Sequence, residues 1–412
     1  MRVFDSINHA LHKFMELMKN SGNIRFLLLI ILAGILRLTV GCYPFSNENF
    51  QVKIDSIAAR LVPNECEGIC NVSAEIGKKG IIILRGETSI SETRNEIIKA
   101  LSKPGIELID SIVFLPDTIK NTEYRGVVNL SVINMRKHPD HRSELVSQAI
   151  LGTPVMILKN EKSWLLIQTP DKYLGWTEKS SVQMMGRTEM EAWRKAARII
   201  YLDNNGWVYT SPDENSIVGD LVAGSILEST GESQDYIKVI FPDKREGFVR
   251  KKPVMDFNLW RSQSICTEDN VCRIATTFLG LPYLWGGTTS KAADCSGFVQ
   301  SVYFLNGRVL PRDASLQADH GIDVDLSQGY YRLERGDLLF FGSKENSINN
   351  VTHVAIYLGD SEYIHSSGRV MINSLDSTKS NYSSSRRNSL LIARRIIGVE
   401  NDTGIIHLYK HH

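Results

Sequence analysis

Residues 294–300 read DCSGFVQ, and no other stretch of the chain says as much about its fold. Asp294 is a favourable N-cap residue, and Phe298 and Val299 continue an apolar pattern with helical spacing. We therefore predict a helix that begins here, with Cys295 in its first turn. The amides and dipole at a helix N-terminus stabilise negative charge, so this position favours a thiolate, the nucleophilic form of cysteine.

A cysteine nucleophile requires a base, and two downstream histidines lie in strand-like sequence. Residues 352–359 read THVAIYLG, residues 362–368 read EYIHSSG, and Asp360-Ser361 is a turn candidate between them. If the two runs form a hairpin, His353 and His365 lie on one face. One imidazole then faces the sulfur while the other fixes its tautomer. Either histidine alone would be interpreted as structural, but together with Cys295 they indicate catalysis.

Several motifs, in this order along the chain, resemble the NlpC/P60 family of cysteine peptidases: Tyr283 with Trp285-Gly286-Gly287, then residues 294–298, 335–338, 352–359 and 364–366. The resemblance covers about residues 264–400 and implies a papain-like α+β domain. It implies Cys295 as nucleophile, His353 as base and His365 as the orienting third residue. Tyr283 would shape the site and assist the oxyanion. The family cleaves bacterial cell-wall peptides, typically after γ-linked D-glutamate.

The same resemblance places further residues at the substrate. Asp294 and Ser296 flank the nucleophile and are expected to contact substrate. The segment PRDAS resembles one that contributes Arg312 and Asp313 to a glutamate pocket, where Arg312 would pair with the free α-carboxylate of the D-glutamyl residue. Related sequences often carry a hydroxyl residue where this chain has Ala314, which leaves that position without a side-chain hydrogen bond.

An internal repeat precedes this region. Residues 127–187 and 199–256 share the order Pro-Asp, Gly, an apolar run and then Pro-Asp-Lys-x-x-Gly-aromatic, and the Gly lies 18 residues before the second Pro in both copies. Units of about 60 residues with short strands and turns suit small barrels. The pattern resembles bacterial SH3-type domains. Upstream, residues 47–125 are predicted to form a small α/β module, in which Ser91 is a candidate N-cap.

Two SH3-type domains before an NlpC/P60 domain resemble the γ-D-glutamyl-L-diamino acid endopeptidases, or dipeptidyl-peptidase VI. In these recycling enzymes the first SH3-type domain partly closes the site, and one of its acids meets the ammonium of a free amino-terminal L-Ala. Glu144 is the candidate acid, and Tyr173 or Trp176 a candidate aromatic wall. A carboxylate facing a blind pocket selects an amine and rejects an amide-linked stem. A solvated glutamate is the alternative interpretation of Glu144.

Composition and the amino terminus define the setting. The chain has 412 residues, and 47 Lys and Arg against 46 Asp and Glu give a net charge of +1, so there is no electrostatic reason to expect nucleic acid.

Residues 26–36 (FLLLIILAGIL) are too short for a membrane span and suit a signal-peptide core. LTVGC at 38–42 resembles an imperfect lipobox. Residues 1–42 therefore predict export to the periplasm or cell envelope, as a lipoprotein anchored through Cys42, a cleaved secreted protein or an uncleaved anchored one.

The remaining cysteines carry no metal prediction. Cys66 with Cys70, and Cys266 with Cys272, lack zinc-site spacing with histidine partners. Each pair is either a local disulfide or two free thiols. Cysteine acyl transfer itself requires neither metal nor organic cofactor.

The predicted reaction is hydrolysis of a murein peptide, L-Ala-γ-D-Glu-diamino acid, at the γ-D-glutamyl bond. The Cys295 thiolate attacks the carbonyl, His353 protonates the leaving amine, and water hydrolyses the thioester. Two alternatives remain: a D,L-endopeptidase that cuts stems of intact peptidoglycan with its SH3-type domains as wall anchors, and a wall-binding protein with an inactive peptidase domain. Lysine and diaminopimelate are equally compatible with the sequence.

Overall fold

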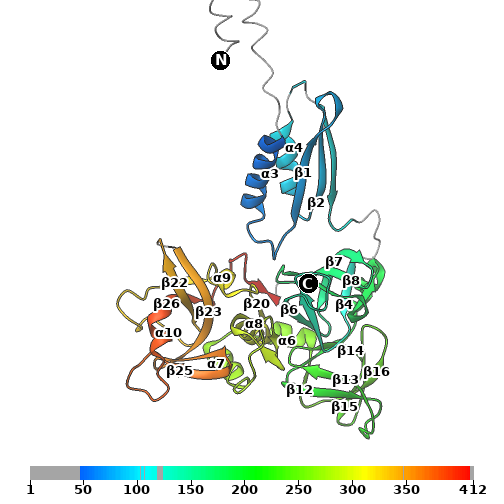
Figure 1. The fold of residues 1–412 in the computed structure, drawn as a ribbon. Coiled ribbons are helices and arrows are strands. Elements are labelled where there is room, and N and C mark those ends of the chain that lie inside the picture. Colours follow the sequence, from blue (N-terminus) through cyan, green and yellow to red (C-terminus); the bar gives the residue numbers. More distant parts are fainter. Residues whose placement is uncertain (1–46, 103, 106, 118–123, 347, 409–412) are drawn as a thin grey trace, which may run out of the picture.

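The computed structural model describes residues 47–102, 104–105, 107–117, 124–346 and 348–408. These residues form a small N-terminal unit, two β-rich units and a C-terminal domain in which helices pack against a six-stranded sheet (Figure 1). The predicted α+β class is confirmed. Residues 1–42, with the lipidation prediction for Cys42, lie outside the described part of the chain. Within the described part, no helix is both long and apolar enough to cross a membrane.

The N-terminal unit is a three-stranded sheet covered by two helices. Its elements are α3 (Asn47–Leu61), β1 (Cys70–Ile76), β2 (Ile82–Thr88), α4 (Ser91–Leu101) and β3 (Leu108–Phe114). Strand β1 pairs with β2 antiparallel, whereas β2 and β3 are parallel and α4 forms the crossover between them. The N-cap prediction for Ser91 is wrong. Ile90 is the cap residue, because the Thr88 hydroxyl accepts the Ile90 N–H at 3.2 Å and the turn closes one residue early.

The two β-rich units have the same topology, as the repeat predicts. The first contains β4 (Arg125–Val128), β5 (Val132–Arg136), β6 (Leu145–Ile150), β7 (Pro154–Glu161), β8 (Trp164–Gln168), β9 (Leu174–Glu178) and β10 (Val182–Met185). The second contains β11 (Arg198–Tyr201), β12 (Asn205–Tyr209), β13 (Ile217–Val222), β14 (Ile226–Ser233), β15 (Tyr236–Ile240), β16 (Glu246–Arg250) and β17 (Val254–Asp256). The sheets run β10-β4-β7-β8-β9-β5-β6 and, matched strand for strand, β17-β11-β14-β15-β16-β12-β13. Helix α5 (Arg187–Lys195) connects them.

The C-terminal domain packs helices against a six-stranded antiparallel sheet, order β21-β26-β22-β23-β24-β25. The sheet strands are β21 (Ile322–Val324), β22 (Leu338–Glu345), β23 (Ile348–Gly359), β24 (Glu362–Ser367), β25 (Arg369–Ser374) and β26 (Leu390–Arg395). Its helices are α7 (Glu268–Thr276), α8 (Cys295–Leu305), α9 (Ala314–Gln317) and α10 (Ser384–Ser389), whereas α6 (Phe257–Gln263) before them packs against β11 and β17 of the second β-rich unit. Short strand pairs β18 (Thr288–Thr289) with β19 (Ala292–Ala293) and β20 (Arg308–Val309) with β27 (Ile406–His407) complete it.

Helix α8 is the central element of this domain. Its apolar face, with Phe298 and Val302 fully buried, shares one core with Val354 and Ile356 of β23 and Ile364 of β24. Burying these side chains stabilises the fold by roughly 1.5–3 kcal/mol each. The consequence is that the N-terminus of α8 lies over the β23–β24 hairpin.

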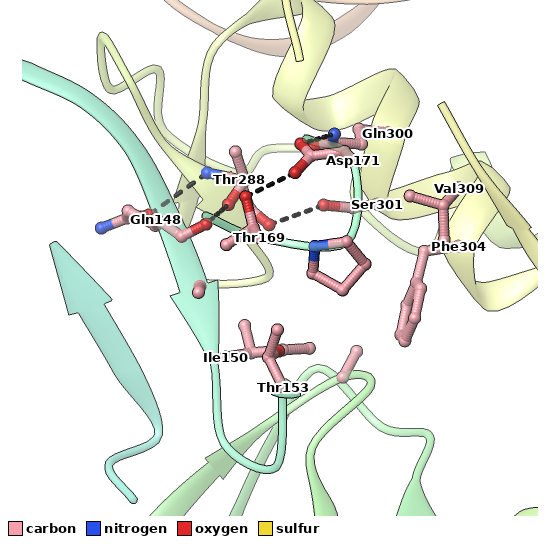
Figure 2. Close-up of a pocket in the computed structure, with 13 residues that line it drawn as sticks. Gln148, Ile150, Thr153, Thr169, Asp171, Thr288, Gln300, Ser301, Phe304 and Val309 are labelled. Atoms are coloured by element: carbon pink, nitrogen blue, oxygen red, sulfur yellow. Dashed lines mark hydrogen bonds between the residues drawn. The ribbon is translucent and has the colours of Figure 1, made fainter. Parts of the chain in front are cut away.

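Both barrels also meet α8, at a cavity of about 110 Å³ (Figure 2). Ile150 and Thr153 of the first barrel line it together with Ala223 of the second barrel and Phe304 of α8. At its rim Gln300 Nε2 of α8 donates a hydrogen bond of 2.7 Å to the carboxylate of Asp171, the residue labelled beside it. The lining includes none of the three residues that sequence analysis proposes for catalysis, so this cavity belongs to the domain junction.

Candidate active site

Cys295 is the first residue of α8, as predicted. Asp294 is the N-cap, and its Oδ1 accepts a hydrogen bond from the Gly297 N–H at 2.8 Å. A Cβ at Gly297 would lie 2.0 Å from the Gly287 carbonyl oxygen. Only glycine therefore allows the first turn of α8 to rest on the Gly286-Gly287 turn. Asp294 is tied to the same turn, since its Oδ2 accepts the Gly286 N–H at 2.9 Å.

The predicted hairpin is present. Strands β23 and β24 pair antiparallel around Asp360 and Ser361, which both have positive φ. Ser366 Oγ donates to the Ala293 carbonyl at 2.7 Å, which ties β24 to the residue before the N-cap. The backbone N–H groups of Val354 and Ser296 both interact with the Cys295 sulfur. The nucleophile candidate thus lies against the strand that carries His353.

The two histidines contact each other, and their tautomers follow from a third residue. His353 Nε2 lies 2.7 Å from His365 Nδ1, and His365 Nε2 lies 2.8 Å from Asn373 Oδ1. The Asn373 amide is oriented by its Nδ2, which donates to the Asn381 carbonyl at 2.9 Å. Since a carboxamide oxygen only accepts, His365 Nε2 carries the proton, its Nδ1 accepts from His353 Nε2–H, and His353 Nδ1 is left as the basic nitrogen. Sequence reasoning missed Asn373.

Burial dominates the electrostatics of the three groups. It raises the pKa of the Cys295 thiol, an effect that Asp294 reinforces and the neighbouring backbone N–H groups oppose. It holds the pKa of His353 well below its usual value and lowers that of His365 to about 4, and Arg386 adds to both effects. Desolvation disfavours charged forms. Burial therefore favours the neutral thiol and the neutral imidazoles, and it opposes the helix-end preference for a thiolate that the sequence predicts.

Arg312 and Asp294 form a buried ion pair. The Arg312 side chain is 1% exposed, and its Nη2 lies 2.5 Å from Asp294 Oδ2. Its Nη1 also donates to Ser296 Oγ at 3.0 Å, and its Nε to Ser147 Oγ of the first barrel at 3.2 Å. The guanidinium that was expected to bind a substrate carboxylate is thus already neutralised by Asp294. In this arrangement Arg312 holds Asp294 and Ser296 beside the nucleophile.

The first barrel reaches the same region through two further residues. Tyr173 hydrogen-bonds the Asp313 carboxylate, whose pKa is raised mainly by burial. Glu144 is exposed, and its Oε1 accepts a hydrogen bond from Trp285 Nε1 at 2.9 Å, next to the Gly286-Gly287 turn. The structure therefore brings Glu144 and Tyr173 of the first barrel into contact with Trp285 and Asp313 of the catalytic domain. Tyr283 is half-buried, and burial together with the nearby Cys295 raises its pKa to about 12.

The N-terminal unit also contacts the first barrel near the site, which the sequence did not suggest. In the loop between α3 and β1, the Cys66 carbonyl accepts the Leu174 N–H at 2.7 Å, and the Glu67 carbonyl accepts from Gln168 Nε2 at 2.9 Å. The Cys66 side chain packs against the core that contains Tyr173. Burial raises the pKa of the Cys66 thiol to about 12, and Asp313 contributes to this shift. This loop therefore lies at the end of the site that the first barrel borders.

The five cysteines of the described residues are free thiols: Cys66, Cys70, Cys266, Cys272 and Cys295. Neither the Cys66–Cys70 nor the Cys266–Cys272 disulfide that the sequence left open is formed. Among the described residues there is no group of three or more His, Cys, Asp or Glu side chains arranged to hold a metal ion.

A cysteine at a helix start, a basic imidazole and a second imidazole that orients it define a papain-like cysteine hydrolase site. Comparison with known families agrees. Residues 280–388 match the NlpC/P60 family, and residues 135–182 match the bacterial dipeptidyl-peptidase SH3 domain. The chain therefore contains an NlpC/P60 domain together with a dipeptidyl-peptidase SH3 domain, and it is a cysteine peptidase of the NlpC/P60 type.

Curated relatives agree with these domain matches. A γ-D-glutamyl-L-lysine dipeptidyl-peptidase of Bacillus cereus is 28% identical over 54% of this chain and 68% of its own length. Dipeptidyl-peptidase 6 of Lysinibacillus sphaericus is 28% identical over 61% of this chain and 92% of its own length. These relatives support a cell-wall peptidase activity.

The fold is shared with a solved structure. The crystal structure of an NlpC/P60 family protein from Bacillus cereus superposes with a TM-score of 0.57, at 21% identity, over 66% of this chain and 99% of the other. At 21% identity, this structural similarity shows a shared fold.

Proposed function

We propose that this peptidase cleaves the γ-D-glutamyl-L-diamino acid bond of murein peptides that have a free amino-terminal L-Ala. Cys295 is the nucleophile, His353 the base and His365 the orienting residue. The proposed substrate-binding residues are Tyr283, Asp294, Ser296, Arg312, Asp313, Glu144 and Tyr173. Arg312 also holds Asp294 and Ser296 in place through hydrogen bonds. The observation that carries the proposal is that the first barrel reaches the Cys295 region with a carboxylate, Glu144, on the catalytic domain's Trp285.

The chemistry follows from the neutral resting state. As the Cys295 sulfur attacks the γ-carbonyl, His353 Nδ1 takes the thiol proton and the imidazolium forms. His365 Nδ1 accepts the His353 Nε2–H and so stabilises that charge. The imidazolium then gives its proton to the leaving amine. In the second half, His353 takes a proton from water, which attacks the thioester and frees Cys295.

Selection of a free amine follows from the closed end of the site. The first barrel contributes Glu144 and Tyr173, and the Cys66 loop supports Tyr173 from behind through Leu174. An ammonium gains from a carboxylate there, whereas an amide-linked stem lacks that charge and has to continue past these elements. Short recycled peptides therefore suit the site better than stems of intact peptidoglycan. A cell-wall substrate and the signal-like segment at residues 1–42 favour an exported protein, with attachment to the membrane only if Cys42 carries a lipid.

The proposed domains are 47–125, 127–187, 199–256 and 264–400, after a signal segment at 1–42. Most strands lie within these proposed ranges, but β4 (Arg125–Val128) and β11 (Arg198–Tyr201) begin before residues 127 and 199, and β27 (Ile406–His407) lies after residue 400.

The test compares L-Ala-γ-D-Glu-L-Lys with its N-acetylated form. We expect kcat/KM to fall on the order of 100-fold on acetylation, because a charged hydrogen-bonded contact is lost and replaced by a desolvated carboxylate. Glu144→Gln should remove most of that discrimination. Glu161→Gln, at an exposed glutamate of the same barrel, is the matched control and should leave it unchanged.

Three outcomes contradict the proposal in different ways. Equal turnover of both peptides points to the endopeptidase alternative. Activity retained in Cys295→Ala rules out the mechanism. A failure of an electrophilic peptide to label Cys295 supports the inactive wall-binding alternative.

A further inference from the structure

We propose that Arg386 forms a binding subsite for a carboxylate of the leaving diamino acid. The subsite adjoins His353, no residue of the first barrel lines it, and the proposal rests on the function proposed above. Its ligand class is a carboxylate carried by the residue whose amine is released. Two carboxylates qualify, the α-carboxylate of that residue and the side-chain carboxylate of diaminopimelate.

The subsite consists of two adjoining hollows that share Ser367 and Arg386. The first is lined by these two residues with Tyr283, Thr352, His353 and Gly368. The second is lined by them with His365, Met371 and Asn373 and by hydroxyl side chains of α10 and its N-cap, among them Ser383 and Ser385. Apart from Met371 the lining of this second hollow is polar, and Arg386 is the one residue in it with a permanent charge. Such a lining suits a small charged group better than an apolar side chain.

Arg386 has no acidic partner among the described residues. Its Nη2 lies 3.5 Å from Ser367 Oγ, and its guanidinium carbon lies 5.8 Å from the centre of the Phe341 ring. None of the ion pairs that the described residues form includes it, whereas Arg394 and Arg395 of the next strand pair with Asp323 and Asp337. A half-buried guanidinium without a counter-ion, beside a catalytic imidazole, is costly unless an anion occupies the site during function.

The hollows face the leaving group. The acyl side is occupied by Asp294, Ser296 and the first barrel, and none of those residues lines either hollow. His353 lines the first hollow and is the group that protonates the released amine. In an α-amino acid the carboxylate is attached to the same carbon as that amine, so a residue whose nitrogen is at His353 carries its carboxylate toward Arg386. The second hollow then accommodates the rest of the side chain.

A bound carboxylate would also help the reaction. The positive charge of Arg386 disfavours the imidazolium of His353 in the empty site. A carboxylate paired with Arg386 neutralises that charge when His353 has to hold the proton. Arginine suits this task because its planar fork binds a carboxylate through two parallel hydrogen bonds.

The experiment measures kcat/KM of the full chain for L-Ala-γ-D-Glu-L-Lys and for its C-terminal amide. The wild-type protein should prefer the acid on the order of 10- to 100-fold, the value of a charge-assisted contact. Arg386→Gln should bring the ratio close to one, and Arg386→Lys should retain part of it. The acid-to-amide ratio cancels any general effect on folding or on His353. Arg387→Gln is the matched control, since the neighbouring Arg387 hydrogen-bonds Tyr382 and Tyr330 instead, and it should keep the wild-type ratio.

Two further substrates identify which carboxylate is bound: the meso-diaminopimelate tripeptide amidated at its α-carboxylate or at its side-chain carboxylate. The amide that loses the preference marks the group on Arg386. If neither diaminopimelate amide is cleaved more slowly than the parent acid, or if Arg386→Gln keeps the preference, the subsite is refuted while the proposed function stands. If none of these peptides is cleaved, the proposed function itself fails.

Discussion

At the scale of single residues, an asparagine determines which nitrogen of the catalytic histidine is basic. Asn373 sets the tautomer of His365, and His365 sets that of His353. The basic nitrogen, His353 Nδ1, is therefore determined by a residue that does not itself contact His353. Cys295 and both histidines could be located from local sequence because each stands in a motif with its own secondary-structure signal. Asn373 has no such signal, since its role depends on the pairing of β24 with β25 and on the Asn381 carbonyl.

Replacing Asn373 should change catalysis without moving the nucleophile. We expect Asn373→Ala to lower kcat on the order of 10-fold or more, because either tautomer of His365 becomes available. In Asn373→Asp the carboxylate accepts the same hydrogen bond and favours protonated imidazoles. The lowered pKa of His353 places the acid limb of kcat/KM below pH 6.5 in the wild type, and the aspartate should move that limb to higher pH. A purely structural role would predict lower stability and an unshifted pH profile.

The raised pKa of Cys295 predicts how the free thiol reacts. The rate of alkylation by iodoacetamide, measured without substrate, should rise with pH and continue to rise above pH 9.0, the ordinary thiol value. A preformed thiolate–imidazolium pair would instead give a plateau through neutral pH. Cys295→Ala provides the background from the other four described thiols, whose pKa values burial also raises.

At the scale of elements, the start of α8 and the hairpin were predictable because capping and alternation are local properties. The partner of Asp294 was not. Arg312 follows it by 18 residues and is joined to it only when the segment before α9 folds back over α8. The resemblance predicts that Arg312 contacts substrate, and the structure shows that it also forms a buried ion pair with Asp294. A buried pair of this kind is strongly destabilising when only one partner is removed.

Asp294 variants should separate its two structural roles. Asp294→Ala leaves Arg312 buried without a counter-charge and removes the cap, at a cost of about 3–5 kcal/mol in the free energy of unfolding. Asp294→Asn keeps an oxygen for the Gly297 N–H and should cost less. Urea titration followed by tryptophan fluorescence measures both. Asp319→Ala, at an exposed carboxylate of the same domain, should change stability by about 0.5 kcal/mol or less. Equal midpoints for Asp294→Ala and Asp319→Ala would show that the pair is not stabilising.

At the scale of the whole molecule, the repeat explains how a binding barrel becomes part of an active site. The glycine between the third and fourth strands of each copy has positive φ, +84° at Gly152 and +89° at Gly224. Gly152 lies against Ile226 of the second barrel, and Gly224 against Ile150 of the first barrel and Phe304 of α8. The repeat was visible in the sequence, but this junction was not, because contacts between domains leave no periodic pattern.

Disturbing the junction between the two barrels should lower activity as well as stability. A Cβ at position 152 would lie 2.3 Å from the Ile226 carbonyl oxygen, and alanine also disfavours the positive φ by roughly 1–2 kcal/mol. We therefore expect Gly152→Ala to lower Tm by several degrees and to lower kcat/KM for the free-amine peptide more than for its acetylated form, because the first barrel carries Glu144 and Tyr173. Gly231→Ala is the control, since a Cβ at Gly231 would have open space within 4 Å and the residue lacks positive φ, so both readouts should stay near wild type. Loss of Tm with an unchanged ratio between the two peptides would mean that the barrel's placement does not govern amine selection.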